Sequence, residues 1–418
     1  MVVEGEGVTT LLNRVRGALW GMYIGDALSM PVHWYYDRRR IQQDFGKIEG
    51  YARPVAKFPG SIMNLSNTGG GGRGSDQGNI IGDVILHGKR DFWLRGGQYH
   101  YHHGMQPGEN TLDTLLCRLL VNTIQANPDL LEVENYDNIG SLGPGGKNGG
   151  QESGSVGPSA LVDKYLEEYA RFMTTPGSHN DVYAATAHRM FFANWARAKK
   201  DERTSARALR TFADNDGHNT DSIDGIINVI PFTLLRVTSL PNDVDREAWV
   251  SDIINALRRS EELPQWGVLY DELLGRVLLG QPLRAAVLEV AEKINPGFIK
   301  VLKKAATTSS DSDPMTACYI QSSFPAMLVF AYKYADDPVK ALLASANAGG
   351  ENVNRSAILG ALMGAAHGAG NFEDSSRMKN LQRGLFNADA YEQEVEKFVT
   401  LMEKRSKQTA ETKKKSEL

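Results

Sequence analysis

The chain has 418 residues and a formal net charge of −4, which is enough length for one large domain or two ordinary ones. Its 41% hydrophobic and 23% charged residues are typical of a globular protein, and the near-neutral charge argues against a general nucleic-acid-binding surface. Two cysteines cannot form a disulfide framework. Because no secretory leader opens the chain and the longest apolar run is too short to cross a bilayer, we expect a cytoplasmic protein that binds neither nucleic acid nor membranes.

The first predicted helix covers about residues 11–28, where apolar side chains recur with the helical period. It leads into the segment GDALSMPVHWYYD, in which Pro31 marks the helix end. Asp26 and His33 stand near the aromatic residues 34–36, and this combination suits a pocket for a planar ring. A packed turn capped by Asp26 would explain the same residues equally well.

Two glycine-rich segments are irregular. Residues 69–78 lack the Lys-Ser/Thr pair that completes a phosphate-binding P-loop, and residues 141–159 are typical of a flexible insertion. Between them, the segment YHYHHG holds three histidines without a cysteine or glutamate at zinc-site spacing. We interpret it as a substrate-side loop or a surface cluster rather than a metal site. The three are His100, His102 and His103.

Polar clusters precede several of the later helices. Asn110 or Thr111 can cap a helix that carries Asp113 in its first turn. Residues 178–181 read Ser-His-Asn-Asp and precede another long helix with an apolar face. Taken alone, each cluster is explained by an ordinary helix cap.

A further polar cluster, at residues 217–225, contains His218, Asp221 and Asp224 and also precedes a helix. Periodic helical stretches then continue to about residue 346. Because few alternating strand patterns occur, the residues predict a mainly α fold.

The last polar cluster opens the segment AGGENVNRSAILGALMGAAHG at residues 348–368. Gly349 and Gly350 let the backbone turn sharply, and Glu351 and Asn354 then stand at a helix N-terminus, where free N–H groups favour carboxylates. The small residues behind them recur at three- and four-residue spacings, so this helix can approach its neighbours closely. A tightly packed core helix with a capped start is the competing interpretation.

In order and spacing, these clusters together resemble the motifs of the ADP-ribosylglycohydrolase family, which includes the dinitrogenase-reductase-activating glycohydrolases and the J1 crystallins. GALWGMYIGDALSMPVHW is similar to the family's first helix and its Gly-Asp-Ala-Leu turn, and GENTLDTLL to its Thr-Asp-Asp-Thr motif. GSHNDVYAATAHRMFFANWARA is similar to its Thr-His helix, and NAGGENVNRSAILGALMGA to its Gly-Gly-Asp-Thr-Asp-Thr motif. The resemblance spans about residues 14–370.

The resemblance implies a compact, all-α, single-domain bundle, which we place at residues 11–403. Composition predicts flexible insertions near 60–82 and 140–158 and a charged, disordered tail at 404–418. The resemblance also implies two bound magnesium ions, which prefer hard oxygen ligands and keep part of their water.

Several positions depart from the family pattern. Leu112 stands where the first Asp of the Thr-Asp-Asp-Thr motif is expected, Val353 replaces an Asp of the last motif, and His33 replaces an acid near the first. Because leucine and valine cannot ligate a metal, we expect one weakly bound magnesium ion or none. The expected metal ligands are Thr111, Asp113, Glu351 and Asn354.

The resemblance implies a hydrolase that cleaves an N- or O-glycosidic bond of ADP-ribose, carried by a small molecule or a protein. We expect Asp113, Glu351 and His33 to be catalytic. The lost ligands favour an alternative, an inactive member that binds ADP-ribose or has a structural, crystallin-like role; in a third possibility, the other histidines have taken over the cleavage of a different glycoside. The residues expected to bind the substrate are Asp26, His179, Asn180, Asp181, Gly349 and Gly350.

Overall fold

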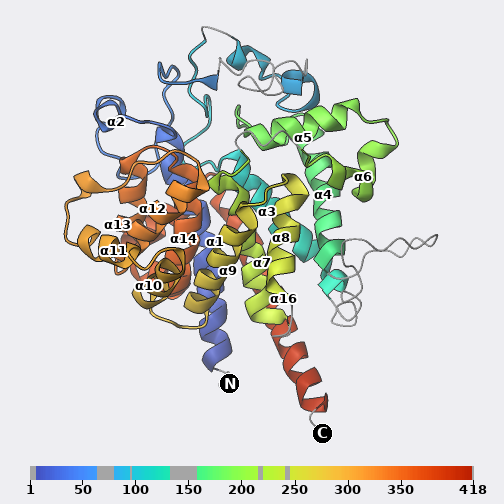
Figure 1. Ribbon diagram of the computed structural model, residues 1–418, viewed down its shortest axis with the longest axis vertical. Helices are drawn as coiled ribbons and strands as arrows, with labels where there is room; N and C mark the ends of the chain where they lie inside the picture. The colour runs from blue at the N-terminus through green and yellow to red at the C-terminus, as the bar shows by residue number, and fades with distance from the viewer. Residues whose placement is uncertain are drawn as a thin grey trace.

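The chain folds into a bundle of α-helices (Figure 1). The structure is a computed structural model that describes residues 6–63, 80–94, 97–131, 158–214, 220–240 and 245–416. Within these ranges, extended pairing is confined to three isolated β-bridges, so the all-α fold expected from the sequence is confirmed. The helices are α1 (Glu6–Ser29), α2 (Arg38–Phe45), α3 (Leu112–Ala126), α4 (Pro158–Thr174), α5 (Thr186–Arg197), α6 (Ala206–Thr211), α7 (Val229–Ser239), α8 (Arg246–Leu257), α9 (Leu263–Leu278), α10 (Leu283–Ile294), α11 (Phe298–Ala305), α12 (Ile320–Lys333), α13 (Pro338–Ala348), α14 (Val353–Asp374), α15 (Ser376–Arg383) and α16 (Ala388–Ser416).

Helices α1 and α14 lie side by side in the middle of the bundle and run antiparallel (Figure 1). Their backbones touch because glycines face each other. A Cβ atom on Gly21 would lie 2.0 Å from the carbonyl oxygen of Gly360, and one on Gly364 would lie 1.8 Å from that of Gly17. No residue larger than glycine fits at these positions without movement of a backbone. The contact brings the C-terminal end of α1 beside the N-terminal end of α14.

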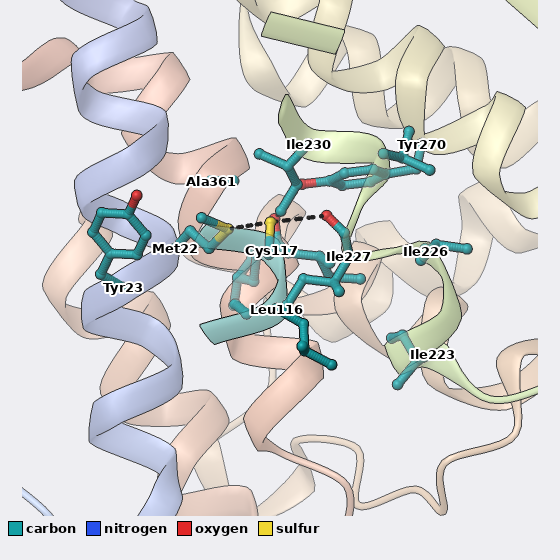
Figure 2. Close-up of a cluster of buried hydrophobic side chains, with 14 of the residues drawn as sticks. Met22, Tyr23, Leu116, Cys117, Ile223, Ile226, Ile227, Ile230, Tyr270 and Ala361 are labelled. Atoms are coloured by element: carbon teal, nitrogen blue, oxygen red, sulfur yellow. Dashed lines mark hydrogen bonds between the residues drawn. The ribbon is translucent and has the colours of Figure 1, made fainter. Parts of the chain in front are cut away.

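The helix pair packs against α3, α7 and α9 in a continuous apolar core. Figure 2 shows Cys117 of α3 between Met22 of α1 and the turn before α7. The Cys117 Sγ atom lies 3.5 Å from Met22 Sδ and 3.6 Å from the carbonyl oxygen of Ile227. Burial raises the pKa of the Cys117 thiol, so this cysteine remains a neutral, apolar core residue.

Helix α16 covers most of the segment that the sequence predicts to be a disordered tail. It continues to Ser416, and two of its polar side chains bond to the body of the protein. Arg405 donates to the carbonyl oxygen of Leu131, and Thr409 Oγ1 donates to that of Ser239 at 3.1 Å. At Arg405 and Thr409 the structure therefore differs from the predicted tail, because these residues, spaced by about one helical turn, reach partners in the body of the protein.

Several predicted features lie outside the described residues. They are the glycine-rich segment 69–78, most of the insertions expected near 60–82 and 140–158, and His218. In the part of the chain that the structure describes, no helix combines the length and the apolar character needed to span a bilayer.

Candidate active site

The site forms where the end of α1 meets the starts of α3 and α14. Asp26 of α1 caps α3 from outside that helix: its Oδ2 accepts from the Thr111 N–H at 2.9 Å and its Oδ1 from Thr111 Oγ1 at 2.6 Å. Asp181 accepts from the Leu112 N–H at 2.9 Å. Burial raises the pKa of Asp26 to about 6, although these hydrogen bonds lower it. The two carboxylates satisfy the first N–H groups of α3 and so fix the position of Asp113.

The turn at Gly349 and Gly350 carries Glu351 into the site. Both glycines have positive φ, 73° and 69°, and a Cβ on Gly349 would lie 2.3 Å from the carbonyl oxygen of Tyr35. The Trp34 N–H donates to the Gly350 oxygen at 2.9 Å, and the Gly350 N–H donates to the Tyr35 oxygen at 2.7 Å. This backbone pairing requires glycine, and it fixes Glu351 against the segment that follows α1.

Asp113 and Glu351 converge on one amide group. Asn354 Nδ2 lies 3.1 Å from Asp113 Oδ2 and 3.4 Å from Glu351 Oε1, and the Asn354 backbone N–H donates to Glu351 Oε1 at 3.2 Å. The other oxygen of Asp113 lies 3.2 Å from His188 Nε2. The structure thus brings together two candidate catalytic residues and one candidate ligand.

A row of buried side chains leads from Glu351 into the protein. His33 Nε2 lies 2.9 Å from Glu351 Oε2, His33 Nδ1 lies 2.7 Å from His102 Nε2, and His102 Nδ1 lies 2.9 Å from Asp181 Oδ1. Burial lowers the pKa of His102, but the Asp181 carboxylate outweighs it and raises that pKa above its usual value. Burial also raises the pKa of Asp181, and His102 outweighs this and lowers it. The directions of both pKa shifts favour the ion pair between His102 and Asp181. If His102 donates from Nε2 to His33 Nδ1, then His33 can donate from Nε2 to Glu351.

Four of the predicted site residues border a cavity with a volume of about 280 Å³. This volume is close to the lower limit for sites that bind small molecules. Much of its wall is aromatic. Trp34, which has a positive φ of 59°, makes edge contacts with Tyr101 and Tyr183 at centroid distances of 4.5 and 4.9 Å. An aromatic wall beside carboxylates suits a ligand with a planar ring and a sugar. The four are His33, Asp113, Glu351 and Asn354.

The other predicted residues do not border the cavity. Five of them are buried behind the cavity wall and position the residues that border the cavity: Asp26, Thr111, Asp181, Gly349 and Gly350. His179 and Asn180 lie away from it: the His179 ring stacks on Phe172 at a centroid distance of 5.8 Å, and Asn180 Nδ2 donates to Glu109 Oε1 at 2.6 Å.

Two charged residues of the cavity wall were not predicted as site residues. Asp224 belongs to a cluster that reads as a helix cap, but it borders the cavity and accepts from Arg258 Nη2 at 2.5 Å. Arg189 also borders the cavity, and its place between His188 and the apolar residues 190–192 is the sequence signal that could have found it. Of the two interpretations of the histidine cluster, a surface location is wrong for His100 and His102, which are 0% and 2% exposed; the alternative of a substrate-side loop stays a prediction.

The oxygen donors do not fit a pair of magnesium ions. Leu112 and Val353 are buried and offer no oxygen. Both oxygens of Glu351 are engaged, one by His33 and one by Asn354, and the Asn354 NH₂ group lies between the carboxylates, where a bridging cation would need ligands. Among the described residues, no three or more His, Cys, Asp or Glu side chains are arranged to hold an ion.

Comparison with known proteins agrees with the fold and the motifs. The chain is similar to a solved structure described as an ADP-ribosylglycohydrolase-related protein complex, with a TM-score of 0.51 and 16% identity over 94% of this chain and 99% of that one. At this identity the likeness concerns the fold. No curated protein matches the sequence. A family model described as ADP-ribosylglycohydrolase matches residues 8–409, and the chain therefore belongs to the ADP-ribosylglycohydrolase family.

Proposed function

We propose that this protein is a hydrolase that cleaves the N- or O-glycosidic bond between ADP-ribose, or a related ribosyl group, and a small molecule or a protein side chain. Membership of a glycosyl hydrolase family supports this class of reaction. The observation that carries the proposal is the pair Asp113 and Glu351, both hydrogen-bonded by Asn354 at the wall of an aromatic cavity. Glycosidic hydrolysis commonly uses two carboxyl groups beside the anomeric carbon.

The surroundings of the two carboxylates support different roles for them. Glu351 is held by His33 and by a backbone N–H, and it orients the attacking water. Asp113, which faces His188 and Asn354, stabilises the positive charge that develops on the sugar ring.

His33 is the proton-transfer group of the proposal. It borders the cavity and is linked through His102 to Asp181, so hydrogen bonds at both ring nitrogens support a fixed orientation of its ring. Acid–base help from a positioned histidine typically contributes ~10²–10⁴-fold to the rate. The donors do not fit a magnesium pair, so the proposed steps rest on Asp113, Glu351 and His33.

The test replaces each acid by its amide. Asp113→Asn and Glu351→Gln should each abolish the release of ADP-ribose from ADP-ribosylated arginine, serine and simple conjugates, because each removes a charge that the reaction requires. The melting temperature should change little. Glu396→Gln is the matched control, since Glu396 forms an exposed ion pair with Arg16, and it should retain full activity.

The second candidate function is a non-catalytic member that binds ADP-ribose or has a structural role. The buried Leu112 and Val353 at expected ligand positions favour it. Binding of ADP-ribose by the wild-type protein without turnover of any of these substrates would decide for this alternative. Full activity of the Asp113→Asn, Glu351→Gln double variant would move the chemistry to other residues.

A further inference from the structure

Arg189 is a buried cation at the wall of the cavity. It lies in the first turn of α5 and is 3% exposed. Its Nε donates to the carbonyl oxygen of Ala184 at 3.1 Å, its Nη2 donates to Thr186 Oγ1 at 2.9 Å, and its guanidinium carbon lies 5.1 Å from the Trp93 ring centroid. The Nη1 atom makes no hydrogen bond within the described structure. The guanidinium is thus held in place, while the two N–H groups of the buried Nη1 have no acceptor among the described residues.

No carboxylate among the described residues balances this charge. Burial lowers the pKa of Arg189, and the group that partly restores it is the Tyr183 hydroxyl. Arg258 provides the contrast, because this equally buried arginine pairs with Asp224 at 2.5 Å. A buried charge without a counter-charge is costly, and an anion that arrives with a ligand would remove that cost.

The charges of the cavity wall show why such a cation matters. The cavity is bordered by three carboxylates, those of Asp113, Asp224 and Glu351. Among the described lining residues, Arg189 is the only arginine or lysine. Three carboxylates repel an anionic ligand unless a cation holds it. A guanidinium offers paired N–H donors whose geometry matches phosphate oxygens.

We infer that Arg189 binds a phosphate group of the substrate through its guanidinium, and that it selects phosphorylated ribosides over neutral ones. The inference rests on the proposed function, because it concerns the same cavity. In this arrangement the sugar and the glycosidic bond face the carboxylates, while the phosphate pairs with Arg189. Neutral ribosides would leave the Arg189 charge unpaired and would bind more weakly.

Titration calorimetry with ribose 5-phosphate and ribose tests the inference without any turnover. The wild-type protein should bind ribose 5-phosphate at least roughly tenfold more tightly than ribose, as a charged hydrogen bond provides. Arg189→Met should reduce this preference to about twofold or less without loss of ribose affinity, and Arg189→Lys should retain part of it. Arg405→Met, which alters a buried arginine of α16 outside the cavity, is the control and should keep the full preference.

Equal affinity of the wild-type protein for the two sugars, or no measurable binding of ribose 5-phosphate, would overturn the inference. So would a full preference in a folded Arg189→Met protein. If Arg189→Met does not fold, the comparison of wild type with Arg189→Lys decides. Release of ADP-ribose by a wild-type protein with no phosphate preference rejects the role of Arg189 alone. A phosphate preference without turnover keeps that role and rejects the hydrolase.

Discussion

At the scale of single residues, an amide takes the place between two acids that a bridging cation would occupy. Neighbouring carboxylates repel each other unless a donor or a cation lies between them. Asn354 provides the donor, since its Nδ2 atom reaches both Asp113 and Glu351. The side chains can therefore stay close together without a metal.

Asn354→Asp should convert this site into a magnesium site. Three carboxylates would then surround one point, which favours a hydrated divalent cation. Calorimetric titration should give at most one weakly bound magnesium ion for the wild type and clearly tighter binding for the variant. Magnesium should also raise the melting temperature of the variant.

The control for this gain is the Asn354→Asp, Asp113→Asn double variant, which has one carboxylate fewer and should lose most of the added affinity. Identical magnesium responses of Asn354→Asp and the wild type would show that the space between the acids is not suited to a cation.

His179 allows a second test at this scale. Burial lowers its pKa to about 4, so the folded protein holds the neutral ring, while the unfolded chain takes up a proton near pH 6.5. The stability that this provides is present above pH 6.5 and is lost as the pH falls towards 4. His179→Phe should remove this acid loss, roughly 2 kcal/mol between pH 7 and pH 4.5, because phenylalanine can still stack on Phe172.

Urea denaturation of the His179→Phe and wild-type proteins at pH 7 and pH 4.5 measures the difference. An unchanged pH dependence would contradict the assignment of the titration to His179. Because His179 does not border the cavity, the affinity for ADP-ribose should stay the same in both proteins.

At the scale of elements, the contact between α1 and α14 sets the geometry of the site. Asp26 lies near the end of α1, and Glu351 stands two residues before the first residue of α14. The hydroxyl groups of Ser29 and Ser356 meet at 2.8 Å at the same end of the contact. The close approach of the two backbones therefore places the two halves of the site against each other.

Gly364→Ala tests this contact. A Cβ there would lie 1.8 Å from the Gly17 carbonyl oxygen, and since both atoms belong to backbones the overlap cannot be relieved by a rotamer change. We expect a loss of roughly 3 kcal/mol or more in the free energy of unfolding, measured with urea.

Gly370→Ala is the control, at a glycine that follows the kink in α14 at Gly368. A Cβ on Gly370 would meet only the Asn13 side chain, at 3.5 Å, so the change should be nearly neutral, or stabilising by up to ~1 kcal/mol through helix propensity. Equal effects of the two substitutions would show that the helices can separate slightly at little cost.

At the scale of the whole molecule, the end of the chain is part of the fold. Removal of residues 404–418 would delete the contacts of Arg405 and Thr409, whereas removal of 410–418 would keep both. The longer deletion should lower the melting temperature by several degrees and the shorter one by much less. Equal melting temperatures for the full-length protein and the two truncated proteins would support the disordered tail that the sequence predicts.

The helices and the starts of α3 and α14 could be predicted because caps, glycines and apolar spacing are local in sequence. Asp113, Glu351 and Asn354 follow from those starts. The row from Glu351 to Asp181 could not, because it joins four distant segments through contacts that only tertiary packing creates. Asp224 was missed for the same reason.

The facing glycines of α1 and α14 also determine where this protein tolerates added length. One extra residue between Asn354 and Gly360 would turn the start of α14 by about 100° and displace it by about 1.5 Å, so Glu351 would no longer face His33. A substitution at the tips of the helices leaves the spacing untouched. Side chains at the ends of α1 and α14 can therefore be exchanged without loss of the site geometry, as with the amide of Asn354. Insertions between these helix ends and the facing glycines would destroy that geometry.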